Sequence, residues 1–281
     1  MFSFVSDKQG KLSKIALAKN QELSYGYIQK LIRNKDIKVN GKRINKDIVL
    51  SVGDAVDIYY NAISVNKFSI IFEDANILVV FKKKGYTSEA VFEDVKKEYP
   101  NSFFIHRLDT NTDGIMIFAL NQDSNLELLN GFKSHLFEKE YLAYVYGVMP
   151  KESEVLTAYL LKDSQTAFVK IFDKKVEGSS LIKTGYQVLK TYQNYSLLKV
   201  KLFTGKTHQI RAHLASLGHF VLGDGKYGDN KINQAYGLSK QLLTAYSLTL
   251  HFEKQSFLAY LNNKTFTIKE EDFLCHKMPL L

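Results

Sequence analysis

Cysteine is almost absent from this chain of 281 residues, which contains Cys275 alone. A single cysteine excludes an intramolecular disulfide and a zinc site built from several cysteines, and it fits a reducing compartment. Long apolar runs are absent too. None approaches the roughly 20 residues that span a bilayer, and the apolar start of the chain is too short for a signal peptide. We therefore expect a cytoplasmic protein without a membrane segment.

Arginine is scarce as well, with four among the 38 basic residues: Arg33, Arg43, Arg107 and Arg211. Only arginine offers a planar, permanently charged fork of donors, so each position is a candidate for binding a carboxylate or phosphate, with chance retention as the alternative. The formal net charge of +9 favours a polyanionic partner. The apolar content of 45% indicates a globular protein with an ample core, and the length suits one large and one small domain.

The most distinctive stretch is a polar loop, residues 106–114, between the apolar runs 103–105 and 115–120. Such runs are typical of buried strands, which places the loop at the edge of a sheet. Asp109 is a candidate nucleophile or general base, and Arg107 lies two residues before it. The alternative is a turn in which Asp and Asn satisfy backbone groups while Arg107 and His106 are solvated.

The first 60 residues form a strongly basic unit, whose 11 basic and 6 acidic side chains give a net charge of +5. Apolar spacing predicts helices around residues 12–17 and 28–32, then a strand that enters the Asn-Gly turn at 40–41. The second helix and this hairpin carry a basic cluster of Lys30, Arg33, Lys35, Lys38, Lys42 and Arg43. The cluster suits phosphate contacts, and a face that only aids solubility is the alternative.

A larger unit is expected from about residue 67. The sequence predicts strands at 70–73, 77–81, 139–146, 184–189 and 197–202. Helical spacing around residues 126–129 and 210–217 predicts two helices. We place a small domain at residues 1–62 and a larger one at 67–281, with a short linker between them.

Three histidines near residue 210 raise the question of a metal. The spacings between His208, His213 and His219 are five and six residues, which do not place two ligands on one helical face, and no cysteine is nearby. We expect no metal site. Gly205-Lys206-Thr207 lacks the earlier glycine of a Walker motif, which argues against an NTPase.

Three motifs resemble those of one enzyme family. His-Arg-Leu-Asp at 106–109, followed by Thr112 and Gly114, resembles the catalytic motif of the RluA-type pseudouridine synthases. Lys139-x-Tyr141 and the run 204–214 around Arg211, continued by Leu-Gly-Asp at 222–224, resemble two further motifs of that family. The N-terminal unit resembles the αL, or S-four-type, RNA-binding domain. The implied fold is α+β: a small αL RNA-binding domain followed by a catalytic domain with a mixed, mainly antiparallel β-sheet flanked by helices.

The resemblance implies site-specific isomerisation of uridine to pseudouridine in structured RNA, without a cofactor. By resemblance Asp109 is the catalytic aspartate, Arg211 pairs with it, Tyr141 packs against the target uracil as a proposed proton acceptor, and Arg107 helps to hold the position that the flipped base leaves. By analogy the substrate is large-subunit ribosomal RNA, with transfer RNA open. We expect a monomer. The rival reading is a non-catalytic RNA-binding or ribosome-assembly factor that retains the fold.

Two positions depart from the family's pattern. Lys83 stands where a proline is usual, between Lys82 and the pair Lys84-Gly85, which puts the local turn in doubt. Asp113 stands where a serine is usual. This extra carboxylate could oppose ionisation of Asp109 or could point to solvent. We expect Asp113→Ser to bring no strong gain in rate.

Overall fold

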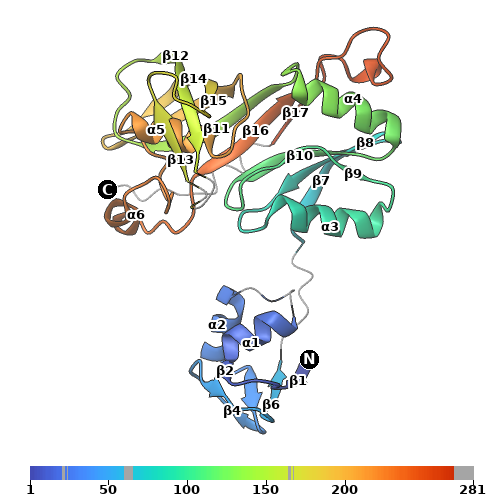
Figure 1. Cartoon of the computed structure of the whole chain (residues 1–281), viewed down its shortest axis with the longest axis vertical. Helices are drawn as coiled ribbons and strands as arrows, with labels where there is room; N and C mark the ends of the chain where they lie inside the picture. The colour runs from blue at the N-terminus through green and yellow to red at the C-terminus, as the bar shows by residue number, and fades with distance from the viewer. Residues whose placement is uncertain (21–22, 24, 60–65, 164–165, 167, 269–281) are drawn as a thin grey trace. The chain divides into compact units, whose positions relative to one another are not determined.

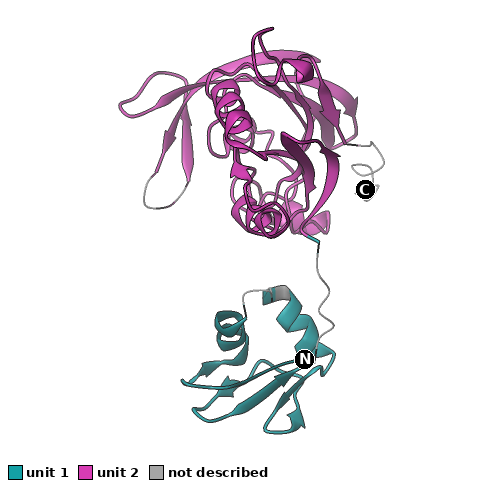
Figure 2. Cartoon of the chain, turned by 90° about the vertical axis from the view of Figure 1, so that its right-hand side faces the viewer, with its two compact units in different colours: residues 1–66 teal, residues 67–281 magenta. Residues whose placement is uncertain are grey.

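The computed structural model describes residues 1–268 except 21–22, 24, 60–65, 164–165 and 167. The chain divides into two compact units, Met1–Asn66 and Lys67–Leu281 (Figure 2). Cys275 and most of the expected linker lie outside the described residues, so the domain boundary at residue 62 stays a prediction. Within the described part, no helix has both the length and the apolar character needed to cross a membrane.

The first unit packs two helices against short antiparallel strands. Helices α1 (Leu12–Lys19) and α2 (Tyr25–Arg33) bury their predicted apolar faces in one core with the strands. The strands are β1 (Phe2–Val5), β2 (Gly10–Lys11), β3 (Ile37–Val39), β4 (Lys42–Arg43), β5 (Val49–Leu50) and β6 (Ala55–Ile58). One sheet has the order β1-β6-β3-β4, and β2 pairs with β5. Both predicted helices are confirmed.

The hairpin between β3 and β4 follows from its turn residues. Asn40 and Gly41 have φ values of 49° and 77°. A type I′ turn needs positive φ at both central residues, and Asn-Gly adopts this at little cost. The predicted Asn-Gly hairpin is confirmed, and it places Lys38 opposite Arg43 in the register of the two strands.

The second unit is built on one large sheet, with 11 strands among the described residues (Figure 1). Its order is β13-β12-β14-β15-β11-β16-β10-β8-β7, with β9 beside β10 and β17 beside β16. The pair β10–β16 is parallel, whereas the pairs on either side of it, β10–β8 and β11–β16, are antiparallel. The predicted class, α+β with a mixed and mainly antiparallel sheet, is confirmed.

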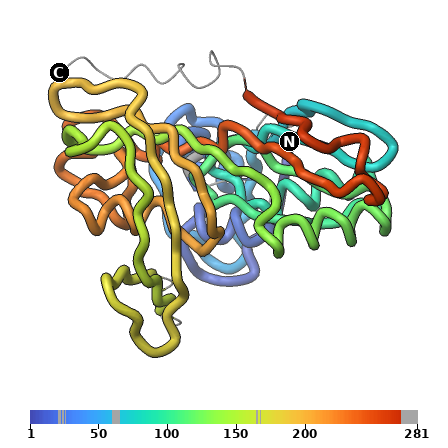
Figure 3. The backbone as a smooth tube through the Cα atoms, turned by 90° about the horizontal axis from the view of Figure 1, so that it is seen from above, coloured from blue at the N-terminus to red at the C-terminus, as the bar shows by residue number. Residues whose placement is uncertain are grey.

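The strands of this sheet are β7 (Phe68–Glu73), β8 (Ile77–Lys82), β9 (Phe103–Phe104), β10 (Asp113–Ala119), β11 (Glu138–Tyr146), β12 (Ser153–Lys162), β13 (Val169–Phe172), β14 (Ser180–Thr191), β15 (Tyr195–Leu202), β16 (Leu243–Thr249) and β17 (Thr265–Thr267). The helices are α3 (Ser88–Glu98), α4 (Gln122–Lys133), α5 (Gln209–Ser216), α6 (Asn230–Ala235) and the 3-10 turn η1 (Ala259–Leu261). Strands β12 and β14 extend beyond the rest of this unit (Figure 3).

Two helices cover opposite faces of the sheet around β8 and β10 (Figure 1). In β8, Ile77 and Val79 share a core with Leu128 of α4, whereas Leu78 shares a different core with Val91 of α3. Successive strand residues point to opposite faces, so a strand covered on both sides is apolar at every position. This explains the unbroken apolar runs that mark β8 and β10 in the sequence.

Helix α5 covers one face of the other half of the sheet. Its Ile210 and Leu214 share a core with Val145 of β11 and Val200 of β15. This packing brings the start of α5 next to the loop before β10, although the two segments are about 100 residues apart in the chain.

Gly114 lets β10 lie against β16. Its φ is +117°, and an added Cβ would lie 2.6 Å from the backbone nitrogen of Ala245 and closer still to the carbonyl oxygen of that residue. Gly114 and Ala245 are partners in the parallel ladder. No side chain fits there, so the motif needs a glycine at residue 114 because the backbones of β10 and β16 approach so closely.

A buried ion pair lies at the start of β10. The side chain of Asp113 accepts a hydrogen bond of 2.5 Å from Thr244 Oγ1, and its Oδ1 lies 3.6 Å from Nζ of Lys84. Asp113 is 7% exposed, so the solvent-pointing alternative is wrong. Burial lowers the pKa of the Lys84 amine, and the charge of Asp113 opposes that shift. The positive charge of Lys84 therefore offsets the negative charge of Asp113.

The segment around Lys82 makes a hydrogen bond to the loop that contains Asp109. The fully buried Lys82 Nζ donates hydrogen bonds to the carbonyls of Tyr86 (2.8 Å) and Thr110 (3.2 Å), and burial lowers its pKa to about 8. The amide of Lys83 donates to the carbonyl of Lys67 at 2.9 Å. A proline has no such donor. Lys83 in place of the usual proline thus adds a backbone hydrogen bond in the turn that the sequence analysis had put in doubt.

Gly114→Ala should lower the free energy of unfolding by roughly 3 kcal/mol or more, because the new Cβ collides with backbone as well as requiring a strained φ. Urea denaturation measures this loss. Gly218→Ala is the matched control: its φ is +84° and nothing lies within 4 Å of the added Cβ. It should lose only about 1 kcal/mol. Equal losses in both variants would contradict the packing argument.

Asp113→Ser should lower the free energy of unfolding by about 3 kcal/mol near pH 7, because it leaves the Lys84 ammonium buried without its opposite charge. The loss should shrink toward about pH 10, since Lys84 then loses its proton in the folded variant before the unfolded chain does. The double variant Lys84→Met/Asp113→Ser should recover most of the stability in the same denaturation experiment. A double variant as unstable as Asp113→Ser would show that the ion pair is not the cause.

Candidate active site

A cleft of about 450 Å³ lies in the second unit, where the loop before β10 meets the segment that enters α5. Its walls include Arg107, Asp109, Tyr141 and Arg211, the four residues that the sequence assigned to this site, and His208, which it did not. Residues separated by about 100 positions in the chain therefore share one cavity.

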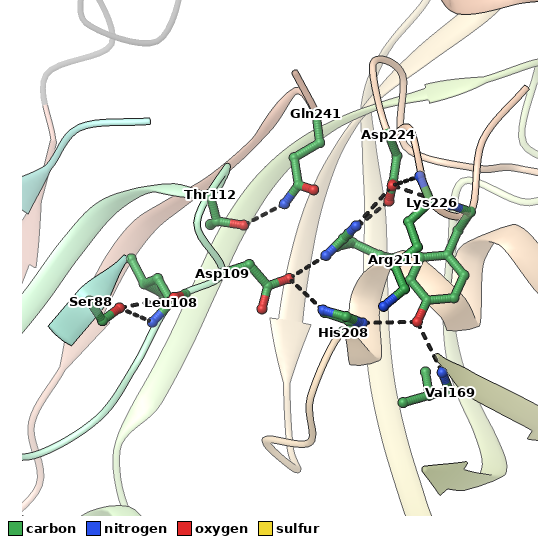
Figure 4. Close-up of polar contacts among 11 residues, drawn as sticks. Ser88, Leu108, Asp109, Thr112, Val169, His208, Arg211, Asp224, Lys226 and Gln241 are labelled. Carbon is green, nitrogen blue, oxygen red and sulfur yellow. Dashed lines mark hydrogen bonds and ion pairs between the residues drawn. The ribbon is translucent and has the colours of Figure 1, made fainter. Parts of the chain in front are cut away.

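Arg211 binds the carboxylate of Asp109 directly. Nη1 of Arg211 lies 2.7 Å from Oδ2 of Asp109 (Figure 4). Arg211 is the third residue of α5 and is 7% exposed, whereas the Asp109 side chain is 24% exposed and faces the cleft. A short, charge-assisted bond of this kind orients the carboxylate.

A second carboxylate, which the sequence analysis missed as a site residue, holds Arg211 from the other side. Oδ2 and Oδ1 of Asp224 accept hydrogen bonds from Nε (2.7 Å) and Nη2 (2.9 Å) of Arg211. The backbone amides of Lys226 and Tyr227 also donate to Oδ1, at 2.8 and 3.2 Å. This bidentate contact fixes the plane of the guanidinium, so its remaining nitrogen points at Asp109. The signal in the sequence was the run Leu-Gly-Asp that continues the arginine motif.

The two partners shift each other's titration. Burial alone would raise the pKa of Asp224, but the hydrogen bonds and charge of Arg211 and the two backbone donors hold it below its usual range. Burial alone would lower the pKa of Arg211, and the bonds and charges of Asp224 and Asp109 raise it instead. Both side chains are therefore charged throughout the neutral range.

Tyr141 enters the cleft from β11. The register of β11 against β16 shifts between Glu140 and Tyr141, and a bulge of this kind re-aims a side chain. Burial, helped by the charge of Asp109, raises the pKa of the Tyr141 phenol well above its usual value. The group beside Asp109 is thus a neutral phenol.

The two residues at the start of the motif have different surroundings. The Arg107 side chain is 71% exposed at the rim of the cleft, with Nη1 3.5 Å from Oε1 of Glu89. His106 Nε2 accepts a hydrogen bond of 3.1 Å from the amide of Ile117, and its ring stacks on Phe132 at 4.5 Å. Burial, with a smaller effect of Lys139, lowers the pKa of His106 to about 3. The alternative of a loop with both side chains solvated is therefore wrong for His106.

The three histidines near residue 210 have separate partners. Nδ1 of His213 lies 3.1 Å from Oγ1 of Thr184, and Nδ1 of His219 lies 3.0 Å from the carbonyl oxygen of Tyr146. His208 lies in the cleft, with Nε2 4.0 Å from Oδ2 of Asp109. No group of three metal-ligating side chains is found among the described residues.

The basic cluster of the first unit lies on α2 and the β3–β4 hairpin. The Lys38 ammonium and the Arg43 guanidinium lie over the ring of Tyr59, at 5.1 and 5.8 Å, and Arg43 donates a hydrogen bond of 2.5 Å to the carbonyl of Lys35. The exposed members are Lys30, Arg33, Lys35, Lys42 and Arg43. Tyr59 adds an aromatic face that the sequence analysis did not include.

Comparison with known proteins identifies the family. Residues 75–216, which include Asp109, Tyr141 and Arg211, match the family model described as RNA pseudouridylate synthase. An uncharacterized RNA pseudouridine synthase of Aquifex aeolicus is 33% identical over 256 residues, which cover 80% of this chain and 78% of that protein. The ribosomal large subunit pseudouridine synthase C of Haemophilus influenzae is 27% identical, with 90% of this chain and 88% of that protein covered.

Solved structures show the same fold. The structure of human RNA pseudouridylate synthase domain containing 1 aligns with a TM-score of 0.61 and 23% identity, covering 78% of this chain and all of that chain. That of human RNA pseudouridylate synthase domain containing 4 aligns with a TM-score of 0.55 and 22% identity, covering 65% of this chain and 84% of that chain. The chain therefore belongs to the RNA pseudouridylate synthase family and is an RNA pseudouridine synthase, an isomerase.

Proposed function

We propose that the protein isomerises a specific uridine of structured RNA, with large-subunit ribosomal RNA as the substrate and Asp109 as the catalytic aspartate. The observation that carries the proposal is a carboxylate that faces the cleft while a buried arginine holds one of its oxygens. The name of the Haemophilus influenzae relative, ribosomal large subunit pseudouridine synthase C, supports ribosomal RNA over transfer RNA.

The reaction needs no redox step and no group donor. The glycosidic bond between N1 and C1′ breaks, the uracil turns over, C5 bonds to C1′, and C5 then loses its proton. Asp109 would attack C1′ or assist departure of the base. Arg211 contacts Oδ2, and among the described residues no hydrogen bond or ion pair reaches Oδ1. Oδ1 is therefore the atom available to the sugar.

Tyr141 and Arg107 have roles in holding the extruded nucleotide. Chemistry on a stacked base requires its extrusion, and the pocket must replace the lost stacking and pairing. The Tyr141 ring, which lines the cleft, would stack on the uracil; a neutral phenol suits this role, and its proposed part as proton acceptor stays a prediction. Arg107, exposed at the rim, would hold the position that the base leaves.

The first unit would bind RNA as an αL domain, with the proposed boundaries at residues 1–62 and 67–281. Its exposed basic cluster suits contacts with phosphates on neighbouring turns of structured RNA. We also propose that the protein acts as a monomer. The rival, a factor without catalytic activity, would account for this unit but not for Asp109, Tyr141 and Arg211 in one cleft.

Asp109→Asn should lower tritium release from RNA labelled at uridine C5 by more than about 10³-fold, because the amide cannot act as the nucleophile. RNA affinity should change by less than about threefold, since it comes mainly from phosphate contacts. The substrates are ribosomal and transfer RNA from a strain that lacks the enzyme. Asp123→Asn, an exposed site at the start of α4, is the control and should be fully active. No release by the wild type from either pool, with binding intact, would favour the rival.

Replacing Lys30, Arg33 and Lys42 together by Gln should weaken RNA binding and reduce the slope of log K against log salt by about 2 to 3, as three phosphate contacts are lost. The rate at saturating RNA should stay unchanged. Binding titrations at several salt concentrations measure the slope.

The matched control replaces Lys8, Lys11 and Lys14 by Gln. These three are also exposed in the first unit, and the net charge changes equally. The control variant should retain most of the wild-type slope of log K against log salt. Equal effects of the two triple variants would mean that the cluster contributes only general charge, which was the solubility alternative.

A further inference from the structure

A row of polar contacts runs from Val169 through Tyr227 and His208 to Asp109. The amide of Val169, the first residue of β13, donates a hydrogen bond of 3.0 Å to the hydroxyl of Tyr227. That hydroxyl lies 2.9 Å from Nδ1 of His208, whose Nε2 lies 4.0 Å from Oδ2 of Asp109 (Figure 4). The described mechanism makes no use of His208 or Tyr227.

The row favours one position for the proton of the imidazole. Because the Val169 amide can only donate, the Tyr227 oxygen accepts there and has its single hydrogen free for His208. In the arrangement that we infer, Tyr227 donates this hydrogen to His208 Nδ1. Burial lowers the pKa of His208, against the opposing charge of Asp109, so the ring is neutral near pH 7. A neutral imidazole has one N–H, which is left on Nε2 and directed at Asp109.

Packing keeps both side chains in place. The Tyr227 ring lies under the guanidinium of Arg211, 5.3 Å away, and makes an edge contact with Phe168 at 5.7 Å. His208 precedes α5 with a φ of 54°, a left-handed conformation that few non-glycine residues adopt. The side chain makes no cap for the helix and is directed into the cleft instead.

We propose that Tyr227 holds His208 in the Nε2–H form, so that the imidazole becomes the second donor to Asp109 when uridine binds. The inference rests on the proposed function. The separation of 4.0 Å exceeds a hydrogen bond by about 1 Å, and such contacts in free enzymes commonly tighten in the substrate complex. Arg211 and His208 then both donate hydrogen bonds to Oδ2 of Asp109. This orients Oδ1 of Asp109 toward C1′ of the uridine. His208 and Tyr227 are positioning residues, since they act through Asp109.

Tyr227→Phe removes the hydroxyl and keeps the ring. It should lower kcat for tritium release about 10- to 100-fold, as is usual for a partner that orients a reacting group, with KM for RNA within about twofold and an unchanged thermal midpoint. Tyr260→Phe is the control: its hydroxyl also donates a hydrogen bond, of 2.8 Å to Asp74, outside the cleft. Tyr260→Phe should retain full kcat.

Two substitutions at residue 208 distinguish the role of its hydrogen-bond donor from the role of its backbone conformation. Asn tolerates the left-handed conformation best but is too short to reach Asp109, whereas Gln carries an amide N–H at the distance of Nε2. His208→Gln should therefore retain more of kcat than His208→Asn. The reverse order would mean that His208 serves the backbone conformation and would overturn the inference.

¹⁵N spectra of the imidazole supply a readout that a structural role would not move. Wild-type His208 should show the Nε2–H form, and Tyr227→Phe should shift the ring toward a mixture of forms. A wild-type ring with its hydrogen on Nδ1 would overturn the inference. Tritium release by the wild type with an unchanged Tyr227→Phe overturns only this inference, whereas no release by the wild type overturns the proposed function and this inference with it.

Discussion

A buried arginine between two carboxylates is the interaction on which the site depends. Arg211 donates to Asp224 through two nitrogens and to Asp109 through the third. A guanidinium that is 7% exposed is stable only if its donors are satisfied, and removal of one partner leaves a buried charge uncompensated. The same contact joins the loop before β10, helix α5 and the turn that contains Asp224. The position of the carboxylate in the cleft is thus a consequence of buried electrostatics.

A second set of buried charges supports the same loop. Lys82 binds the carbonyl of Thr110, the residue after Asp109, and Lys84 faces Asp113 across the start of β10. The departures from the family's pattern lie in these two segments. An added carboxylate at residue 113 meets an amine at residue 84, and the amide of residue 83 gains a backbone partner. The carboxylate at residue 113 would be unfavourable alone and is compatible with burial because Lys84 faces it.

On the proposed function, RNA binding and chemistry would reside in different units. The first unit offers exposed positive charge, which acts over a Debye length and needs no exact geometry. The second unit offers a cleft in which bond lengths near 2.7 Å define the orientation of one carboxylate. In the proposed function, affinity would therefore come mainly from the first unit and turnover from the second.

The sequence by itself determined the local structure and the order of the motifs. Apolar spacing predicted α1 and α2, Asn-Gly predicted the β3–β4 hairpin, and motif resemblance placed Asp109, Tyr141 and Arg211 in one site. These signals are local, because helical period, strand alternation and turn chemistry act between near neighbours in the chain.

Only the tertiary structure decided the partners: Asp224 on Arg211, Tyr227 on His208, and Lys84 on Asp113. Each pair joins residues from 13 to 29 positions apart. Which distant side chain satisfies a buried charge depends on how helices and strands pack, and local periodicity and turn chemistry do not specify that pairing.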